Sequence, residues 1–200
     1  MRQRRSGWAD EPVESEITEE IFQEDVLDLG TTGTDGPIPG IEPPPIDQQM
    51  PIQRHPSRTN GQVWWVGVTG GCGASTLARL DDEEGPDALD HWPHHPDGQH
   101  VVIVARETIQ SLTAAQHAAK HYASGELTGI QVLALVTVPA HKGRPHPNTA
   151  RLLRLLKGVF PRHYQADWHP DYMAHLDPLE ASHHHGHQRL IRTIHRISKG

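Results

Sequence analysis

The stretch "WWVGVTGGCGASTLARL", residues 64–80, predicts an apolar strand that passes through a glycine-rich loop into a helix. Glycines in such a loop allow successive backbone N–H groups to converge on phosphate oxygens, and the following helix directs its positive end to the same place. The glycines concerned are Gly70, Gly71 and Gly73. This stretch therefore predicts a phosphate-binding loop at the carboxyl end of a strand.

Two positions depart from the usual phosphate-loop pattern, G-x-x-x-x-G-K-[ST]. Val68 stands in place of the first glycine, and Ala74 stands in place of the lysine. Ser75 keeps the hydroxyl that binds Mg²⁺ in this pattern. The loop thus retains its glycines and its serine, but it lacks the main positive side chain.

Apolar runs elsewhere predict the remaining strands and helices. Those over residues 62–68, 100–105 and 129–138 are continuous rather than alternating, which is typical of strands buried on both faces of a parallel sheet. Residues 107–125 and 148–161 have helical apolar spacing, and a short fourth strand follows them. We expect an α/β fold: a small three-layer domain with a mostly parallel sheet of about four strands, like that of P-loop NTPases.

The chain divides into three regions by composition and charge. Residues 1–60 are rich in proline and hold twelve acids against five arginines, and we expect them to be disordered. Within them, residues 14–30 suit either disorder or a short helix that docks on a partner or on the domain itself. The α/β domain is expected over residues 61–172. Residues 173–200 form a histidine-rich tail with a short basic amphipathic helix at 189–199.

The composition also bears on the compartment. Cys72 is the single cysteine, so the chain cannot form an internal disulfide, and a reducing cytosol is the natural environment. The first residues are basic but no apolar run follows them, unlike in a signal peptide. No stretch reaches the ~18 apolar residues of a membrane span. We predict a cytoplasmic protein without a membrane span.

The glycine-rich loop resembles that of the ParA/MinD superfamily of P-loop ATPases, whose deviant motif reads K-G-G-x-G-K-[ST]-T. Laid on this chain, the motif covers residues 69–76, and its glycines and hydroxyl residues match. Both family lysines are absent, because Thr69 and Ala74 occupy their positions. The "GASTLA" form is similar to atypical members of the CpaE pilus-assembly group, in which alanine also replaces the loop lysine.

Later segments extend the resemblance. "VVIVARETIQSLTAAQ", residues 101–116, resembles the strand and helix that follow the Walker B strand in that superfamily. Residues 129–138 resemble the next strand, with Thr137 where an adenine-contacting asparagine often sits. Residues 81–98, where a Walker B strand would have to begin, carry acids but no apolar run. Over residues 62–172 the chain is also similar to a family of uncharacterised small actinobacterial proteins often found with plasmid and conjugation genes.

The resemblance implies a site for ATP or another nucleotide with Mg²⁺. Arg79 and Arg106 are the candidates to replace the missing lysines. Arg106 ends its strand at the edge where ligands bind in open α/β sheets, and an ordinary end-of-strand arginine is the alternative. The expected nucleotide-binding residues are Gly70, Gly71, Cys72, Gly73, Ala74, Ser75, Thr76, Arg106 and Thr137, with Ser75 also holding Mg²⁺.

Two missing lysines and the missing Mg²⁺ aspartate favour little or no hydrolysis, because phosphoryl transfer depends on positioned positive charge. The leading hypothesis is a degenerate P-loop protein that binds a nucleotide or phosphate and regulates a partner in a plasmid or mobile-element context. The alternative is a non-catalytic adaptor that no longer binds nucleotide. A protein partner is expected at the acidic N-terminal segment, and the basic helix at 189–199 predicts weak nucleic-acid contact. The seventeen histidines are better explained as solvated side chains than as metal ligands.

Overall fold

The structure, a computed structural model, describes residues 36–56, 62–82, 88–174, 177–180 and 185–199. Its centre is a four-stranded sheet in the order β2–β4–β5–β6, and all neighbouring strands are parallel. The strands are β2 (Trp64–Gly67), β4 (Gln99–Arg106), β5 (Ile130–Val138) and β6 (His163–Gln165). The predicted α/β fold with a parallel sheet is therefore confirmed.

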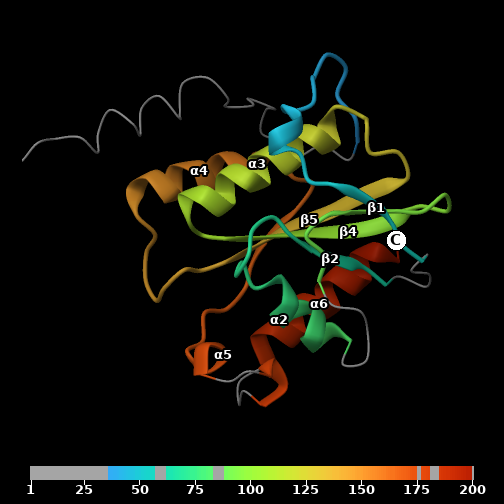
Figure 1. The fold of residues 1–200 in the computed structure, drawn as a ribbon. Helices are drawn as coiled ribbons and strands as arrows, with labels where there is room; N and C mark the ends of the chain where they lie inside the picture. Colours follow the sequence, from blue (N-terminus) through green and yellow to red (C-terminus); the bar gives the residue numbers. More distant parts are fainter. Residues whose placement is uncertain (1–35, 57–61, 83–87, 175–176, 181–184, 200) are drawn as a thin grey trace, which may run out of the picture.

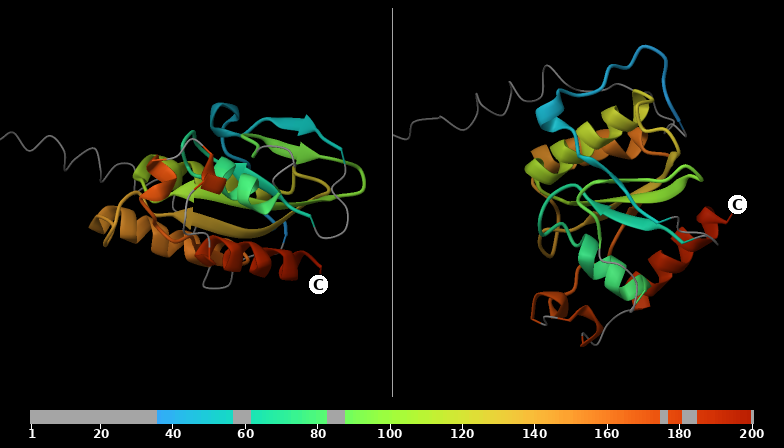
Figure 2. Two further views of the ribbon diagram at one scale, coloured as in Figure 1. Left: turned by 90° about the horizontal axis from the view of Figure 1, so that it is seen from below. Right: turned by 45° about the vertical axis from the view of Figure 1, so that its right-hand side comes forward.

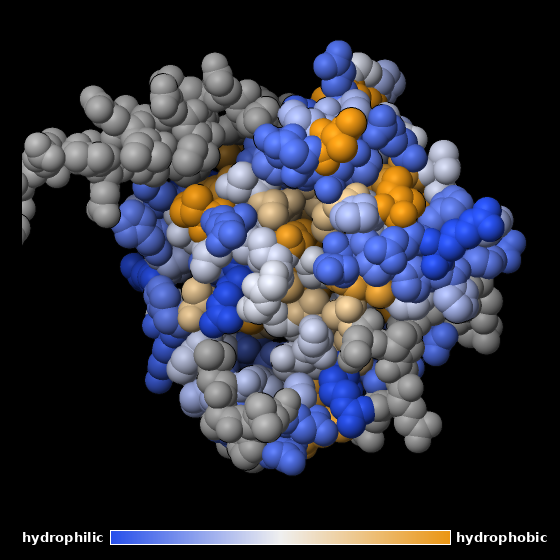
Figure 3. All heavy atoms as spheres, in the orientation of Figure 1, coloured by the Kyte–Doolittle hydropathy of each residue, from blue (hydrophilic) through white to orange (hydrophobic). Residues whose placement is uncertain are grey.

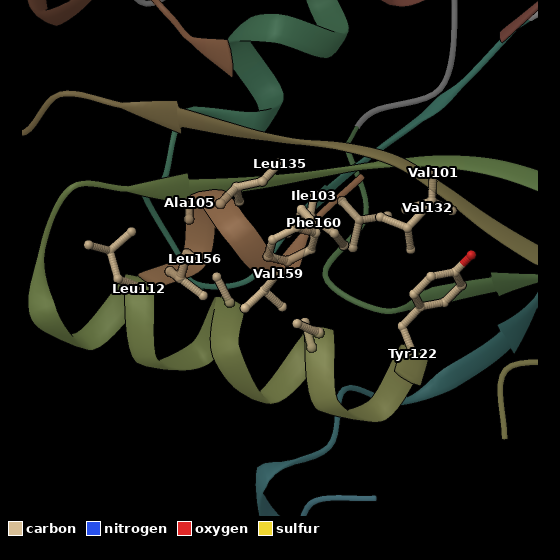
Figure 4. Close-up of a cluster of buried hydrophobic side chains, with 14 of the residues drawn as sticks. Val101, Ile103, Ala105, Leu112, Tyr122, Val132, Leu135, Leu156, Val159 and Phe160 are labelled. Carbon is tan, nitrogen blue, oxygen red and sulfur yellow. The ribbon is translucent and has the colours of Figure 1, made fainter. Parts of the chain in front are cut away.

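Helices cover the sheet on both sides, so the fold has three layers (Figure 1, Figure 2). One face carries α3 (Ile109–Ala123) and α4 (Pro147–Val159), and we call it the α3/α4 face. The other carries α2 (Ala74–Asp81) and α6 (His185–Ser198), and we call it the α2/α6 face. Figure 4 shows the core on the α3/α4 face, where side chains of both helices meet those of β4 and β5.

Local sequence explains where the helices begin. Thr108 precedes α3, and its side-chain oxygen accepts a hydrogen bond from the backbone N–H of Ser111 at 3.3 Å. Such a cap satisfies one of the N–H groups that a helix start leaves without a partner. Helix α4 starts with Pro147, whose fixed φ suits the first helical position and whose missing N–H costs nothing there.

The proline-rich segment 36–56 is part of the packed structure, so the prediction of disorder over residues 1–60 is wrong for this segment. It contains a 3-10 turn, η1 (Ile46–Gln48), and a strand, β1 (Ile52–Arg54), which pairs in parallel with β3 (Trp92–His94). Prolines remove N–H donors but keep their carbonyl acceptors, and Pro51 accepts from the N–H of Trp92. Residues 1–35 and 57–61 lie outside the described residues.

The sequence also places the domain boundary too early. After β6 the chain forms α5 (Asp171–Ala174) and η2 (Pro178–Glu180), and then α6 packs on the sheet. Helix α6 begins before the predicted basic helix, and its apolar side chains are buried; these are Leu190, Ile191 and Ile194. The amphipathic stripe that looked like a surface tail is one of the layers of the domain, because its apolar half needs a partner surface.

An extra residue in β5 changes which side chains point to which face. Val101 pairs with Val132, but the next residue, Val102, pairs with Ala134, so Leu133 is inserted in β5. Leu133 and Ala134 consequently both belong to the core of the α2/α6 face. Because side chains alternate along a strand, a bulge of one residue exchanges the faces of every side chain beyond it.

Candidate functional site

The glycine-rich loop, residues 67–76, lies at the carboxyl end of β2, and close contacts require two of its glycines, Gly67 and Gly73. A Cβ on Gly67 would lie 2.8 Å from the Sγ of Cys72, which itself is buried. Gly73 caps α2 with a φ of 98°, a left-handed conformation, and a Cβ there would lie 3.1 Å from Val138. The loop is therefore a tight turn in which small residues let the chain pass close to β5.

The backbone of this loop offers hydrogen-bond donors. In the described part of the chain, the N–H groups from Thr69 to Thr76 donate to no protein acceptor. The loop also lines a cavity of about 740 Å³, which Figure 3 shows as a hollow beside α5. Ser75, in the first turn of α2, is exposed and lines the same cavity, while Ala74 is buried. Open N–H groups at a helix start beside a cavity suit an anion.

The cavity lies at the carboxyl edge of the sheet. It is lined by the ends of β2, β4 and β5 and by the segment after β6. Open parallel sheets bind ligands at this edge. Beyond the loop, its lining consists of Ala88, Leu89, Asp90, Arg106, Val138, Pro139, Asp167, Trp168, His169, Tyr172 and His187. No lysine is among these described lining residues.

Arg106 is the strongest positive side chain at this cavity. It is the last residue of β4, and it lies on the same face as the loop because its neighbours alternate between the two cores. Its guanidinium donates from Nη1 to the carbonyl of Gly71 at 3.1 Å and from Nη2 to the carbonyl of Ala140 at 3.3 Å. A guanidinium has five N–H donors, so three are left without an acceptor among the described residues. Arg106 can thus hydrogen-bond to the loop and still bind an anion.

Arg79, the other candidate, does not reach the cavity. It lies in the last turn of α2, and its Nη2 is 3.4 Å from Oδ2 of Asp177. Arg79 is not one of the lining residues. Of the two candidates for the missing lysines, the structure brings only Arg106 to the loop.

Thr137 is separated from the loop, which corrects the expectation that it contacts a base. The residue is fully buried, and the bulge in β5 turns it to the α3/α4 face while Val138 turns to the loop. Its hydroxyl donates to Oε1 of Glu107 at 3.1 Å and lies 3.0 Å from Nε2 of His163. A carboxylate only accepts hydrogen bonds, so the hydroxyl gives its one proton to Glu107 and accepts from the His163 N–H.

The same buried network includes Gln165, which donates from Nε2 to Oε1 of Glu107 at 2.5 Å. Burial, together with the nearby positive charge of Lys157, lowers the pKa of His163 to about 4. His163 is consequently neutral at physiological pH. This set of side chains is satisfied internally and is a packing element rather than a ligand site.

Asp90 joins the cavity in a way that the sequence did not predict. Leu89 forms a single parallel bridge to Val66, on the edge of β2 opposite β4. Asp90 follows directly, lines the cavity, and accepts a hydrogen bond from Nδ1 of His91 at 2.8 Å. That bond lowers the pKa of the Asp90 carboxyl. The only signal in the sequence was the Leu–Asp pair itself, because one bridge needs no apolar run.

The bridge also makes β2 a point where the strand order reverses. From β2 the chain goes by α2 to Leu89 on one side, and it then returns to β4 on the other side. In open α/β sheets the crevice at such a reversal is the usual place for a ligand. The cavity thus lies where the topology predicts a binding site.

Aromatic and imidazole rings also line the cavity, a feature that the sequence reasoning missed because it ended the domain at residue 172 and assigned His187 to a tail. Trp168, His169 and Tyr172 come from the segment after β6, and His187 comes from α6. The Tyr172 hydroxyl lies 3.3 Å from Nδ1 of His187, and their ring centroids are 4.6 Å apart. Burial raises the pKa of Tyr172, and the nearby aspartates add to this shift.

The histidines do not assemble a metal centre in the described ranges. No group of three or more His, Cys, Asp or Glu side chains there could hold a metal ion. His121 is buried against Trp92, and burial lowers its pKa, whereas His117 on the same helix is partly exposed. His117 and His121 lie four residues apart, a spacing found in helical zinc sites, but one is buried and the other partly exposed, so they do not present a shared ligand position.

Comparison with known proteins places the chain in a family. It belongs to a family of unknown function, DUF6668, whose model matches residues 61–178. The matched range contains the loop, Arg106 and the aromatic segment after β6. No curated protein and no solved structure matches the chain. No helix within the described residues is both long and apolar enough to cross a membrane.

Proposed function

We propose that this protein binds the phosphate groups of a nucleotide through residues 70–76, hydrolyses it slowly or not at all, and uses the bound state to regulate a partner. The observation that carries this proposal is the row of N–H groups from Thr69 to Thr76, which have no acceptor within the part of the chain that the structure describes and belong to residues lining a cavity at the carboxyl edge of the sheet. The resemblance of the loop to ParA/MinD ATPases agrees with this function. The similarity to small actinobacterial proteins often found with plasmid and conjugation genes suggests a plasmid or mobile-element context.

The cavity also suits the other parts of a nucleotide. Trp168 and Tyr172 offer flat aromatic faces on which a base can stack. Arg106 supplies positive charge beside the loop. Ser75 and Asp90 present a hydroxyl and an exposed carboxylate to the same cavity, and such oxygen donors are what Mg²⁺ prefers. These residues would hold a Mg²⁺–nucleotide complex.

Efficient hydrolysis is not expected from this arrangement. The cavity holds one arginine and no lysine among its described residues, and two of the arginine's donors are engaged with carbonyl groups. Charge neutralisation in phosphoryl transfer depends on several positioned cations. Binding without rapid turnover is the mode of action that we propose.

A second candidate function, a scaffold that no longer binds nucleotide, is favoured by one observation. Arg106 ties the loop to Ala140, and Cys72 and Ala74 of the loop are buried in the core of the α2/α6 face. A loop held in this way can have a purely structural role and bind no ligand. The two candidates differ in whether the full chain binds nucleotide at all.

Calorimetric titration of the full chain with ATP and ADP, with and without Mg²⁺, tests the proposal. The decisive variant is Gly70→Asp, because a Cβ on Gly70 meets no atom within 4 Å and its backbone φ suits a residue with a side chain. It places a negative charge in the phosphate cradle, so we expect at least about tenfold weaker binding, roughly 1.4 kcal/mol. Gly73→Asp should also weaken binding, but its contact with Val138 and its positive φ make it prone to misfold.

Gly36→Asp is the matched control. Gly36 also has no atom within 4 Å of an added Cβ, and it lies outside the loop and the cavity, so the same charge is added elsewhere. We expect this variant to bind like the parent protein. Absence of heat with millimolar ATP in the parent chain would reject nucleotide binding and favour the scaffold.

A further inference from the structure

The charges of the domain are segregated between its layers. Residues 61–200 hold thirteen acids and thirteen bases, but residues 108–166 hold seven bases and a single acid, Glu126. The bases are Lys120, Lys142, Arg144, Arg151, Arg154, Lys157 and Arg162, and all except Lys120 are exposed. This segment includes both helices of the α3/α4 face. The domain has no net charge as a whole, but the side that carries α3 and α4 is strongly basic.

The exposed bases follow the outer surface of α4. Arg151, Arg154 and Lys157 recur at three-residue spacing, while the opposite side of the helix is buried against the sheet. Lys142 and Arg144 precede the helix in the loop after β5, and Arg162 follows it; with the three helical residues they form what we call the α4 basic face. A helix of 13 residues is about 20 Å long, so this face is an extended cationic surface.

We propose that the α4 basic face is the docking surface for the acidic segment of the same chain, residues 10–28. That segment holds nine acids and no lysine or arginine. It lies outside the described residues. Its nine negative charges are opposite in sign to the six positive charges of the α4 basic face. Its apolar residues at helical spacing can contact the helix surface between the basic side chains.

The point where the described chain begins supports this docking. The N–H of Ile38 donates to the carbonyl of Ala123 at 2.8 Å, and Pro37 would meet a Cβ on Gly125 at 3.2 Å. The chain thus enters beside the carboxyl end of α3, which packs against α4. Packed helices lie about 8–10 Å apart. The eight residues from 28 to 36 can span up to about 26–29 Å, which is enough to reach α4.

Tethering favours this occupant over a separate polyanion. A segment joined by a short linker has an effective concentration in the millimolar range, whereas a nucleic acid must also approach a chain with a net charge of −7. The docked segment would shield the α4 basic face, so any anionic partner must first displace it. Such an intramolecular contact is electrostatic and should weaken as salt increases.

Zero-length carbodiimide cross-linking of the full chain tests the proposal, because it joins carboxylates to lysines in contact. The chain has four lysines, three of them on the α3/α4 side; Lys199, beyond the end of α6, is an internal control. At low salt we expect cross-links from residues 10–28 to Lys142 and Lys157, with Lys199 at least about fivefold less frequent. Cross-links should be lost at about 0.5 M salt.

Matched charge reversals separate a specific contact from general attraction. Arg151→Glu/Arg154→Glu changes an exposed pair on α4, and Arg189→Glu/Arg192→Glu changes an equally spaced exposed pair on α6. Both leave all four lysines in place. The α4 variant should lose most cross-links to Lys142 and Lys157, and the α6 variant should keep them.

Three outcomes would overturn the proposal. They are equal cross-linking to Lys199, an equal loss in both charge-reversal variants, and no cross-links from residues 10–28 at low salt. Salt-sensitive retention of the full chain on DNA that only the α4 variant loses, in the absence of such cross-links, would instead assign the α4 basic face to nucleic acid.

Discussion

The carboxyl edge of the sheet is open on one face and closed on the other. On the α2/α6 face, the ends of β2, β4 and β5 surround a cavity lined by the glycine-rich loop and Arg106. On the α3/α4 face, the same edge holds Glu107, Thr137 and His163, whose polar atoms bond to one another. Arg106 and Glu107 are neighbours in the chain, yet Arg106 lines the cavity and Glu107 belongs to the buried hydrogen-bond network.

This difference shows that alternation along a strand decides whether a polar residue is available to a ligand. The inserted Leu133 exchanges the faces of the residues beyond it, so that Thr137 joins the buried network and Val138 contacts Gly73 of the loop. Without the insertion, Thr137 would point to the loop. A bulge of one residue therefore separates a possible ligand contact from a structural hydrogen bond.

The contrast between the two faces requires that α6 packs stably on the sheet and forms a hydrophobic core there. Ile194→Ala tests this packing, and its expected effect is the largest. Ile194 is fully buried between α6 and the sheet. Deleting its side chain to alanine should lower the free energy of unfolding by about 2–5 kcal/mol, measured by urea denaturation. Arg192→Ala, exposed on the same helix, should change it by less than about 0.5 kcal/mol. Equal small changes would mean that α6 is not part of the cooperative fold.

Thr137→Val tests the closed face, and a smaller effect is expected. The substitution keeps the shape but removes the hydroxyl that accepts from His163 and donates to Glu107. We expect a loss of about 1–3 kcal/mol in unfolding free energy, because buried polar groups lose a partner. Exposed Thr128→Val should cost much less. Nucleotide affinity should stay the same; a large loss of affinity with unchanged stability would place Thr137 at the ligand.

Arg106→Gln tests the open face. The variant loses the charge that we propose for phosphate binding, while its amide can still donate to one carbonyl of the loop. We expect about tenfold weaker ATP binding by calorimetry, which corresponds to roughly 1.4 kcal/mol. Arg79→Gln, whose partner is Asp177 outside the cavity, should leave the affinity unchanged. Equal effects of the two variants would contradict a specific role for Arg106.

The pH dependence of His163 gives the smallest expected effect. Its pKa is about 4 in the folded protein, against an ordinary value of 6.5, so above pH 6.5 the imidazole is neutral in both states. Between pH 6.5 and 4 the unfolded chain binds a proton that the folded chain does not, and the free energy of unfolding falls. We expect about 1 kcal/mol of this fall to come from His163 after allowing for solvent screening.

His163→Gln isolates that contribution. A glutamine amide can still donate to Thr137 but does not titrate in this range. Urea denaturation between pH 7.5 and 4.5 should therefore show a shallower loss of stability in the variant than in the parent chain. Parallel curves would mean that His163 does not change its protonation between the folded and unfolded states in this range.

The sequence predicted the elements that have their own local signal. The apolar runs of β2, β4 and β5 and the helical spacing of α3 and α4 were sufficient, because burial on both faces or on one stripe marks each of them. By contrast, β1 and β3 have three residues each, and β3 contains Pro93. Their pairing depends on contacts between distant segments, and no local pattern reveals it.

The candidate site was predictable in part for the same reason. The closely spaced glycines predict the loop, and the position of Arg106 at the end of an apolar run predicts that it lies at the edge of the sheet. Asp90 reaches the cavity through one bridge at Leu89, and the aromatic and imidazole rings that line the cavity come together only when α6 returns to the sheet. Thr137 was misplaced because an inserted residue in a strand has no signature in an apolar run.

The position of Cys72 gives the protein a built-in reporter. It is the only thiol in the chain, it lies within the glycine-rich loop, and it is 3% exposed against Gly67. A thiol reagent can react with it only when the loop opens, so the rate of labelling reports how often the loop opens. A ligand that holds the loop closed would lower the labelling rate of Cys72. Opening of the loop could thus be followed in the native chain without engineering a cysteine into it.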